Sequence, residues 1–102
     1  MARRPSLATL RVLSSFVEQP TTWRHGYEIS KTLDIASGTL YPILMRLSER
    51  GHLETQWTES PIEGRPRRHT YRLTPGGRTW ALGAIADAQR SGVVSRLGMN
   101  PT

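Results

Sequence analysis

The sequence predicts a mainly helical fold that contains one small β-hairpin. Before residue 51, apolar residues recur at spacings of three and four in three separate segments, as they do along the buried face of a helix. Two segments of alternating apolar and polar residues then flank a stretch rich in proline, glycine and arginine, which is typical of a hairpin. Thr74 and Pro75 open a last helix, because threonine is a good N-cap and proline favours the first helical position.

The composition indicates one soluble domain. At 102 residues the chain has room for a single modest core, and no segment reaches the ~20 consecutive apolar residues that a membrane-spanning helix needs. There is no cysteine, which excludes disulfides, thiol catalysis and sulfur-ligated metal sites. No long apolar segment follows the first residues, so we expect a cytoplasmic protein with no membrane partner.

The first two helices are expected before residue 34. The first covers residues 6–18, with Ser6 as its N-cap. Its apolar stripe consists of Leu7, Leu10, Leu13, Phe16 and Val17. A short helix over residues 27–33 follows, and residues 34–36 form the turn after it.

The third helix is expected to be capped by Ser37 or Thr39 and ended by Gly51. Pro42 is expected to mark the helix start, where few or no backbone donors have a helical partner to lose. The inward stripe consists of Leu40, Ile43, Leu44 and Leu47. The face opposite this stripe exposes Tyr41, Pro42, Met45 and Arg46, with Thr39 on its flank.

The hairpin strands are expected around residues 53–57 and 71–73, joined by a solvent-facing tip over residues 60–68. The last helix is expected to run from Pro75 to Arg96. Its seam consists of Leu82, Ile85, Gln89 and Val93, with Trp80, Ala84 and Ala88 on a neighbouring face. A helix of ~20 residues is ~30 Å long, more than so small a domain covers by itself, so we expect another subunit to pack on it.

The net charge of +6 is concentrated in one part of the chain. Residues 64–78 carry five arginines and no acid, whereas residues 25–63 carry three cations and six acids. The five arginines are Arg65, Arg67, Arg68, Arg72 and Arg78. Such clustering favours contact with a polyanion through one patch, and the plain alternative is a solvated charged loop.

Two short runs, Gly-Thr-Leu-Tyr-Pro at residues 38–42 and Gly-Arg-Pro-Arg-Arg at residues 64–68, indicate a winged helix that binds double-stranded DNA. The first residues of a helix that enters the major groove contact base edges. Ser37 and Thr39 suit this contact, although each also suits a purely capping role, and Tyr41 suits a phosphate. Because the third helix offers only two cations, the arginines of the hairpin must supply most of the affinity.

Further motifs occur in a characteristic order. They are His25-Gly26-Tyr27-Glu28-Ile29, Gly38-Thr39-Leu40-Tyr41-Pro42, Arg46-Leu47, Gly51, Gly64-Arg65-Pro66-Arg67-Arg68 and Tyr71-Arg72-Leu73-Thr74. In this order the chain resembles PadR-type transcriptional regulators over residues 6–90. The resemblance implies a homodimeric winged helix-turn-helix repressor, with a DNA-binding part over residues 1–74 and a C-terminal dimerisation helix and tail over residues 75–102. It also implies that a small aromatic or drug-like effector binds between the subunits, although the alanine-rich last helix departs from the family pattern.

The residue roles that we expect fall into three groups. The DNA-binding residues are Ser37, Thr39, Tyr41, Pro42, Arg46, Arg65, Arg67 and Arg68. The residues that support contact with the DNA backbone are Arg24, His25 and Tyr27. The dimerisation residues are Leu10, Leu13, Trp80, Ala84, Ile85 and Ala88. No catalytic residue, metal ligand or cofactor is expected.

Two other classes of function compete with DNA binding. Catalysis is disfavoured because the three histidines lie in three different elements and no metal-ligand pair occurs at helical spacing. No serine lies in a Gly-x-Ser-x-Gly motif, and the phosphate-binding glycine motif is absent from the sequence. A winged-helix module that binds RNA or a protein partner is the stronger alternative, since a fold does not fix a function. RNA binders stack exposed aromatic rings on bases, and here Phe16, Trp57 and Tyr71 are expected on apolar faces, which leaves Tyr41.

Overall fold

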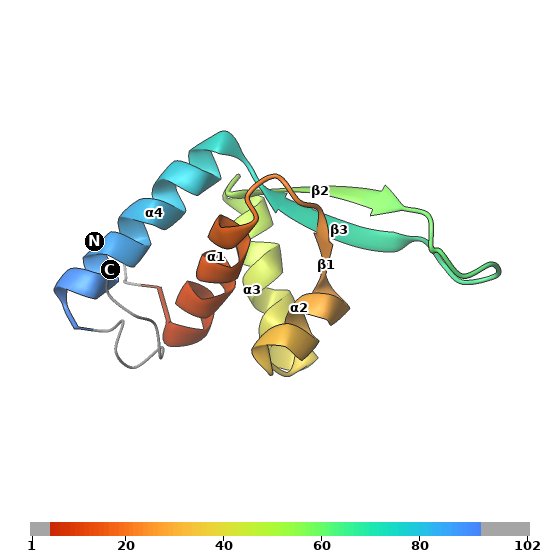
Figure 1. Cartoon of the computed structure of the whole chain (residues 1–102), viewed down its shortest axis with the longest axis horizontal. Helices are drawn as coiled ribbons and strands as arrows, with labels where there is room; N and C mark the ends of the chain where they lie inside the picture. The colour runs from red at the N-terminus through yellow and green to blue at the C-terminus, as the bar shows by residue number, and fades with distance from the viewer. Residues whose placement is uncertain (1–4, 93–102) are drawn as a thin grey trace.

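The computed structural model describes residues 5–92. The elements in this part of the chain are α1 (Leu7–Glu18), β1 (Arg24–His25), α2 (Gly26–Leu33), α3 (Ser37–Glu49), β2 (Leu53–Thr58), β3 (Arg68–Leu73) and α4 (Pro75–Arg90). Figure 1 shows α4 alongside α1 at one end of the molecule and the β2–β3 hairpin projecting from the helices at the other. The hairpin with the loop of residues 59–67 is the wing. The predicted mainly helical fold, a winged helix-turn-helix, is confirmed.

Two helix starts follow the predicted capping chemistry. The Oγ atom of Ser6 accepts a hydrogen bond from the amide of Thr9 at 3.1 Å, and α1 begins at the next residue. The Oγ1 atom of Thr74 accepts one from the amide of Gly77 at 2.8 Å, with proline at the first position of α4. These hydroxyls satisfy amides that have no partner within their helices.

The strand β1 is a feature that the sequence did not predict. Its two residues pair with β3 in antiparallel register, Arg24 opposite Tyr71 and His25 opposite Thr70, so that the strand order is β1-β3-β2. A strand of two residues is too short to carry an alternating pattern. Its effect is to fix the start of α2 beside the wing.

The start of α3 differs from the prediction. Its N-cap is Ala36, whose carbonyl accepts from the amides of Thr39 and Leu40 at 2.9 Å, and no side chain caps the helix. Neither Ser37 nor Thr39 is therefore the cap. Pro42 consequently lies inside the helix and not at its first turn, so the carbonyl of Gly38 loses its usual helical donor.

The core lies between α1, α3 and the sheet. The predicted inward stripe of α3 is buried in full, together with Phe16 of α1 and Ile29 of α2. The whole cluster is Val12, Leu13, Phe16, Ile29, Ile35, Leu40, Ile43, Leu44, Leu47, Leu53, Tyr71, Leu73 and Ala81. This burial fixes the opposite face of α3 toward solvent.

The last helix is shorter than predicted, because α4 ends at Arg90 and not at Arg96. Val93 and Arg96 lie outside the described residues. Small residues form its buried face, namely Gly77, Ala81 and Ala88, which allows α4 and the rest of the fold to approach closely. The predicted seam residue Leu82 is 46% exposed. Over residues 5–92, the helices all fall short of the length and apolarity needed to cross a membrane.

Candidate nucleic-acid interface

The exposed face of α3 and the wing border one groove of about 490 Å³. Its lining residues are His25, Gly26, Tyr27, Tyr41, Arg65, Arg68 and His69. Five of the residues that we expected at the DNA surface therefore lie together, although they come from β1, α2, α3 and the wing. The groove combines two guanidinium groups with hydroxyl and imidazole groups, all of which can donate hydrogen bonds to phosphate oxygens.

The position of Tyr41 depends on Gly26. A Cβ atom built on Gly26 would lie only 2.6 Å from Cε1 and 2.7 Å from the hydroxyl oxygen of Tyr41. The phenol ring therefore lies against the backbone at the start of α2, and only glycine leaves it room. This contact fixes the direction in which the hydroxyl group of Tyr41 enters the groove.

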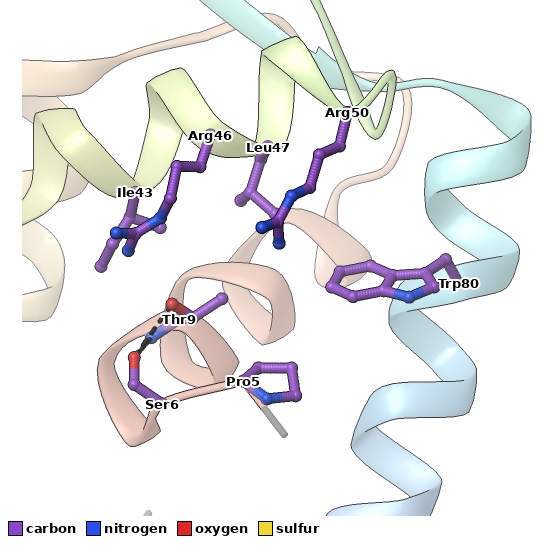
Figure 2. A pocket seen from close by; sticks show the side chains of 8 residues that line it. All are labelled: Pro5, Ser6, Thr9, Ile43, Arg46, Leu47, Arg50 and Trp80. Carbon is purple, nitrogen blue, oxygen red and sulfur yellow. Dashed lines mark hydrogen bonds between the residues drawn. The ribbon is translucent and has the colours of Figure 1, made fainter. Parts of the chain in front are cut away.

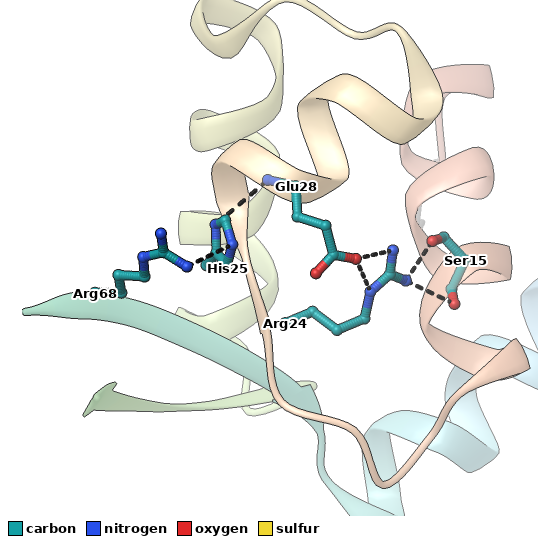
Figure 3. A network of polar contacts seen from close by, with 5 residues as sticks. All are labelled: Ser15, Arg24, His25, Glu28 and Arg68. Carbon is teal, nitrogen blue, oxygen red and sulfur yellow. Dashed lines mark hydrogen bonds and ion pairs between the residues drawn. The ribbon is translucent and has the colours of Figure 1, made fainter. Parts of the chain in front are cut away.

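His25 joins the start of α2 to the wing. Its Nδ1 atom lies 3.4 Å from the amide of Glu28, and its Nε2 atom lies 3.3 Å from Nη1 of Arg68 (Figure 3). Both neighbours are donors, whereas a neutral imidazole has only one nitrogen that accepts. One of the two hydrogen bonds therefore forms at a time, and Arg68 is only loosely held.

Arg24 does not have the predicted role. It is 5% exposed, and its guanidinium group pairs with Glu28 Oε1 at 3.0 Å and donates to the carbonyl and hydroxyl oxygens of Ser15 (Figure 3). It also lies 5.8 Å from the ring centre of Phe16. Arg24 is thus a buried link between α1 and α2 and cannot contact DNA.

The positive charge of the wing comes from three arginines, since Arg72 pairs with Glu54 and lies over Trp23, 4.3 Å from its ring centre. Arg65 and Arg67 are exposed, and Arg68 is half-buried. In the described part of the chain, no carboxylate forms an ion pair with any of these three. Their charges are free to meet phosphates.

The prediction for Trp57 is wrong, because its side chain is 60% exposed instead of lying on an apolar face. In β2 only Leu53 is fully buried, and the strand beyond it extends away from the core, so its later residues have no helix to pack on. The indole stacks on His69 with 4.6 Å between ring centres, and the guanidinium group of Arg67 lies 5.9 Å from the indole. Tyr27 is 63% exposed as well, so Tyr41 is not the only accessible aromatic residue near the groove.

The N-terminal turn of α3 carries the other predicted contacts. Ser37, Thr39 and Pro42 are exposed, and the two hydroxyl groups have no hydrogen-bond partner among the described residues. Arg46 follows Pro42 by four residues and is exposed on the same face of α3. Its side chain also lines a second cavity toward α1 and α4, away from the groove beside the wing.

The predicted dimerisation residues are also divided. Leu10, Leu13 and Ala88 are buried within the protomer, where they pack as part of its interior. Their predicted contact with a second subunit is therefore wrong, since no surface remains to offer. Trp80, Ala84 and Ile85 are half-buried and keep some exposed surface.

Burial governs the two perturbed side chains near α3. It raises the pKa of Tyr71, with a smaller contribution from Tyr41, so Tyr71 stays protonated at neutral pH. Its hydroxyl lies 3.3 Å from Nδ1 of His69. Burial also lowers the pKa of His52, helped by the positive charge of Arg50, so His52 is neutral at pH 7. Among the described residues, no group of three side chains is arranged to hold a metal ion.

Several solved structures share this fold. A PadR-like transcription factor from Bacteroides fragilis superposes with a TM-score of 0.70 at 22% identity, over 88% of this chain and 87% of that one. A PadR family transcription regulator from Clostridium difficile R20291 has a TM-score of 0.70 at 20% identity, over 93% and 100% of the two chains. At these identities the likeness concerns the fold alone.

The sequence itself matches more specifically. The transcriptional regulator Rv3488 of Mycobacterium tuberculosis is 46% identical over 55 residues, which are 54% of this chain and 43% of that protein. Residues 12–81 match the "Transcriptional regulator PadR-like family". This is a family of regulators, which confirms the expectation that the chain is not an enzyme. The protein therefore belongs to the PadR-like family of transcriptional regulators.

Proposed function

We propose that the protein is a homodimeric repressor that binds double-stranded operator DNA in the cytoplasm. The observation that carries this proposal is the groove that brings Tyr41 of α3 together with Arg65 and Arg68 of the wing. A helix that reads bases and a basic loop that grips phosphates act on one duplex only when they border a common surface. Residues 1–74 would form the DNA-binding part.

In this proposal α3 enters the major groove with its N-terminal turn. The hydroxyl groups of Ser37 and Thr39, which have no partner within residues 5–92, donate to or accept from base edges, and the methyl group of Thr39 contacts thymine. Pro42 lies on the same exposed face and supplies apolar contact. The hydroxyl group of Tyr41 holds a phosphate at the edge of the major groove.

The wing supplies most of the binding energy. Arg65 and Arg67 are exposed and form no ion pair with an acid of residues 5–92, so they neutralise phosphates or enter a narrow minor groove. Arg68 leaves His25 and binds a phosphate, since only one of the two contacts of His25 is a hydrogen bond at a time. His25 and Tyr27 then support the DNA backbone beside it.

Residues 75–102 would form the dimerisation helix and tail. α4 presents the exposed side chain of Leu82 and the half-buried side chains of Trp80, Ala84 and Ile85 to a second subunit. A twofold axis would place two copies of α3 on successive half-sites, about one helical turn of DNA apart. A small aromatic effector bound near Trp80 would release the operator by favouring another arrangement of the two helices.

Binding to single-stranded RNA is the second candidate, because the exposed rings of Trp57 and Tyr27 are available for stacking. A fluorescence-polarisation titration separates the two. The probes are a duplex from the region upstream of the coding sequence, a shuffled duplex of equal length and a single-stranded RNA. Tighter binding to the upstream duplex supports the operator proposal, whereas preference for the RNA would replace it. A sedimentation measurement that finds only monomers on the duplex would contradict the dimer.

A further inference from the structure

A second cavity, of about 390 Å³, lies between the far flank of α3, the start of α1 and the side of α4. It is lined by Pro5, Ser6, Thr9, Ile43, Arg46, Leu47, Arg50 and Trp80 (Figure 2). Arg46 follows Tyr41 by five residues, which is about 140° around a helix axis at ~100° per residue. The cavity is therefore distinct from the groove beside the wing, and its volume falls within the range of small-molecule sites.

Two positive charges face into this cavity. Arg46 and Arg50 lie one turn apart, and Figure 2 shows both guanidinium groups pointing from α3 toward the start of α1. In the described part of the chain, the ion pairs formed by side chains join other residues, and neither guanidinium group has an acid partner. The N-terminus of α1 adds a partial positive charge on the opposite wall. The cavity is thus suited to a multiply charged anion.

An aromatic ring closes the α4 side of the cavity. Trp80 stacks on His52 with ring centres 4.0 Å apart and an angle of 7° between the planes, which holds the indole in place. Because burial and Arg50 lower the pKa of His52, this stack adds no positive charge at pH 7. Ile43 and Leu47 contribute apolar surface next to the arginines. A flat ring can therefore pack here beside an anionic group.

We propose that this cavity binds a flat aromatic molecule that carries a phosphate group, the chemistry of a nucleoside monophosphate. Two guanidinium groups match the charge of a phosphate monoester, which lies between about −1.5 and −2 at pH 7. A single carboxylate would leave one of them without a partner. Arg46 and Arg50 bind the phosphate oxygens, and Trp80 and the aliphatic side chains contact the ring. This deepens the effector part of the proposed function by naming the ligand class.

Isothermal titration of the full chain with adenosine monophosphate, without DNA, tests the site separately from the repressor proposal. We expect one molecule bound per chain. Adenosine, which lacks the phosphate, inorganic phosphate, which lacks the ring, and benzoate, which lacks the second charge, should each bind more weakly by about tenfold or more. A variant with both Arg46→Gln and Arg50→Gln should lose binding by a similar factor. Arg78→Gln removes an exposed arginine from α4, outside the cavity, and should bind as the natural chain does.

Several results would overturn the proposal. Among the ligands, they are an affinity for adenosine or inorganic phosphate equal to that for adenosine monophosphate, or tighter binding of benzoate than of the monophosphate. The other two are unchanged binding by the double arginine variant and no heat of binding at millimolar adenosine monophosphate. Both arginines are exposed, so their variants should fold, and circular dichroism checks this. Trp80→Leu provides a second measurement, since loss of the ring contact should weaken the monophosphate and leave inorganic phosphate unchanged.

Discussion

The ring of Tyr41 lies directly against the backbone of Gly26, where an added Cβ atom would approach Cε1 of the ring to 2.6 Å. This contact joins the first residue of α2 to the exposed face of α3. It therefore links the two helices of the helix-turn-helix at the edge of the proposed DNA surface.

Gly26→Ala should displace Tyr41, because the new methyl group and the ring cannot occupy the same space. Since these ring atoms are the outer end of a side chain that is 42% exposed, the ring can turn away, so the free energy of unfolding should fall by less than about 1 kcal/mol while DNA binding weakens. Denaturant titration and fluorescence polarisation measure the two effects. In a Tyr41→Ala background the same glycine change should cost little. An equal cost in both backgrounds would show that the two residues are not in contact.

Gly76 and Gly77 form a matched pair at the start of α4. A Cβ atom on Gly77 would lie 1.9 Å from the carbonyl oxygen of His52, whereas one on Gly76 meets nothing within 4 Å. Gly77→Ala should therefore destabilise the protein by about 3 kcal/mol, and Gly76→Ala should stabilise it by about 0.5 kcal/mol. Thermal unfolding of both variants gives the comparison. Similar melting temperatures would refute the close packing of α4 on the residue before β2.

Arg24→Gln tests the corrected role of this residue. Its loss leaves Glu28 without its ion pair and the oxygens of Ser15 without a donor, so stability should fall by about 1–3 kcal/mol. The dependence of DNA affinity on salt should stay unchanged, because a buried guanidinium group neutralises no phosphate. If DNA affinity of the variant depended less on salt while its stability stayed normal, Arg24 would contact DNA as first predicted.

His52 should make stability depend on pH. Burial lowers its pKa from the usual 6.5, so on acidification the unfolded chain takes up a proton before the native protein does. The stability that neutral His52 contributes is thus lost as the pH falls below the pKa of this histidine in the unfolded chain. The loss ends once the pH is below its lower pKa in the native protein. Free energies of unfolding between pH 7 and 5 should decline less for His52→Gln. Parallel profiles for the two proteins would contradict the assigned shift.

Local chemistry made part of this structure predictable from the sequence. The cap at Ser6, the Thr74-Pro75 helix start and the buried stripe of α3 each depend on residues within one or two turns. The grouping of Tyr41 with Arg65 and Arg68 follows from the order of the motifs.

Long-range contacts decided the features that the sequence did not predict. β1 forms because β3 provides an edge for it to pair with, and Arg24 is buried because it bonds to Ser15 of α1 as well as to Glu28, four residues further along the chain. Trp57 is exposed because the core ends before it does, although its alternating pattern is that of a buried face. The sequence near Arg24 shows Glu28 at a spacing of four, but it does not indicate Ser15 or the edge of β3, and the pattern around Trp57 does not show where the core ends.

The central claim is tested most directly with a variant in which Arg65, Arg67 and Arg68 are all changed to Ala. The quantity to measure is the salt dependence of its binding to operator DNA. If each of two subunits neutralises about four phosphates, the slope of log affinity against log salt is about −7 for the natural chain. The variant should bind all duplexes more weakly with a slope of about −2, because six of about eight phosphate contacts are lost at ~0.9 each. A slope that stays near its original value would contradict the role of the wing and of the groove that it borders.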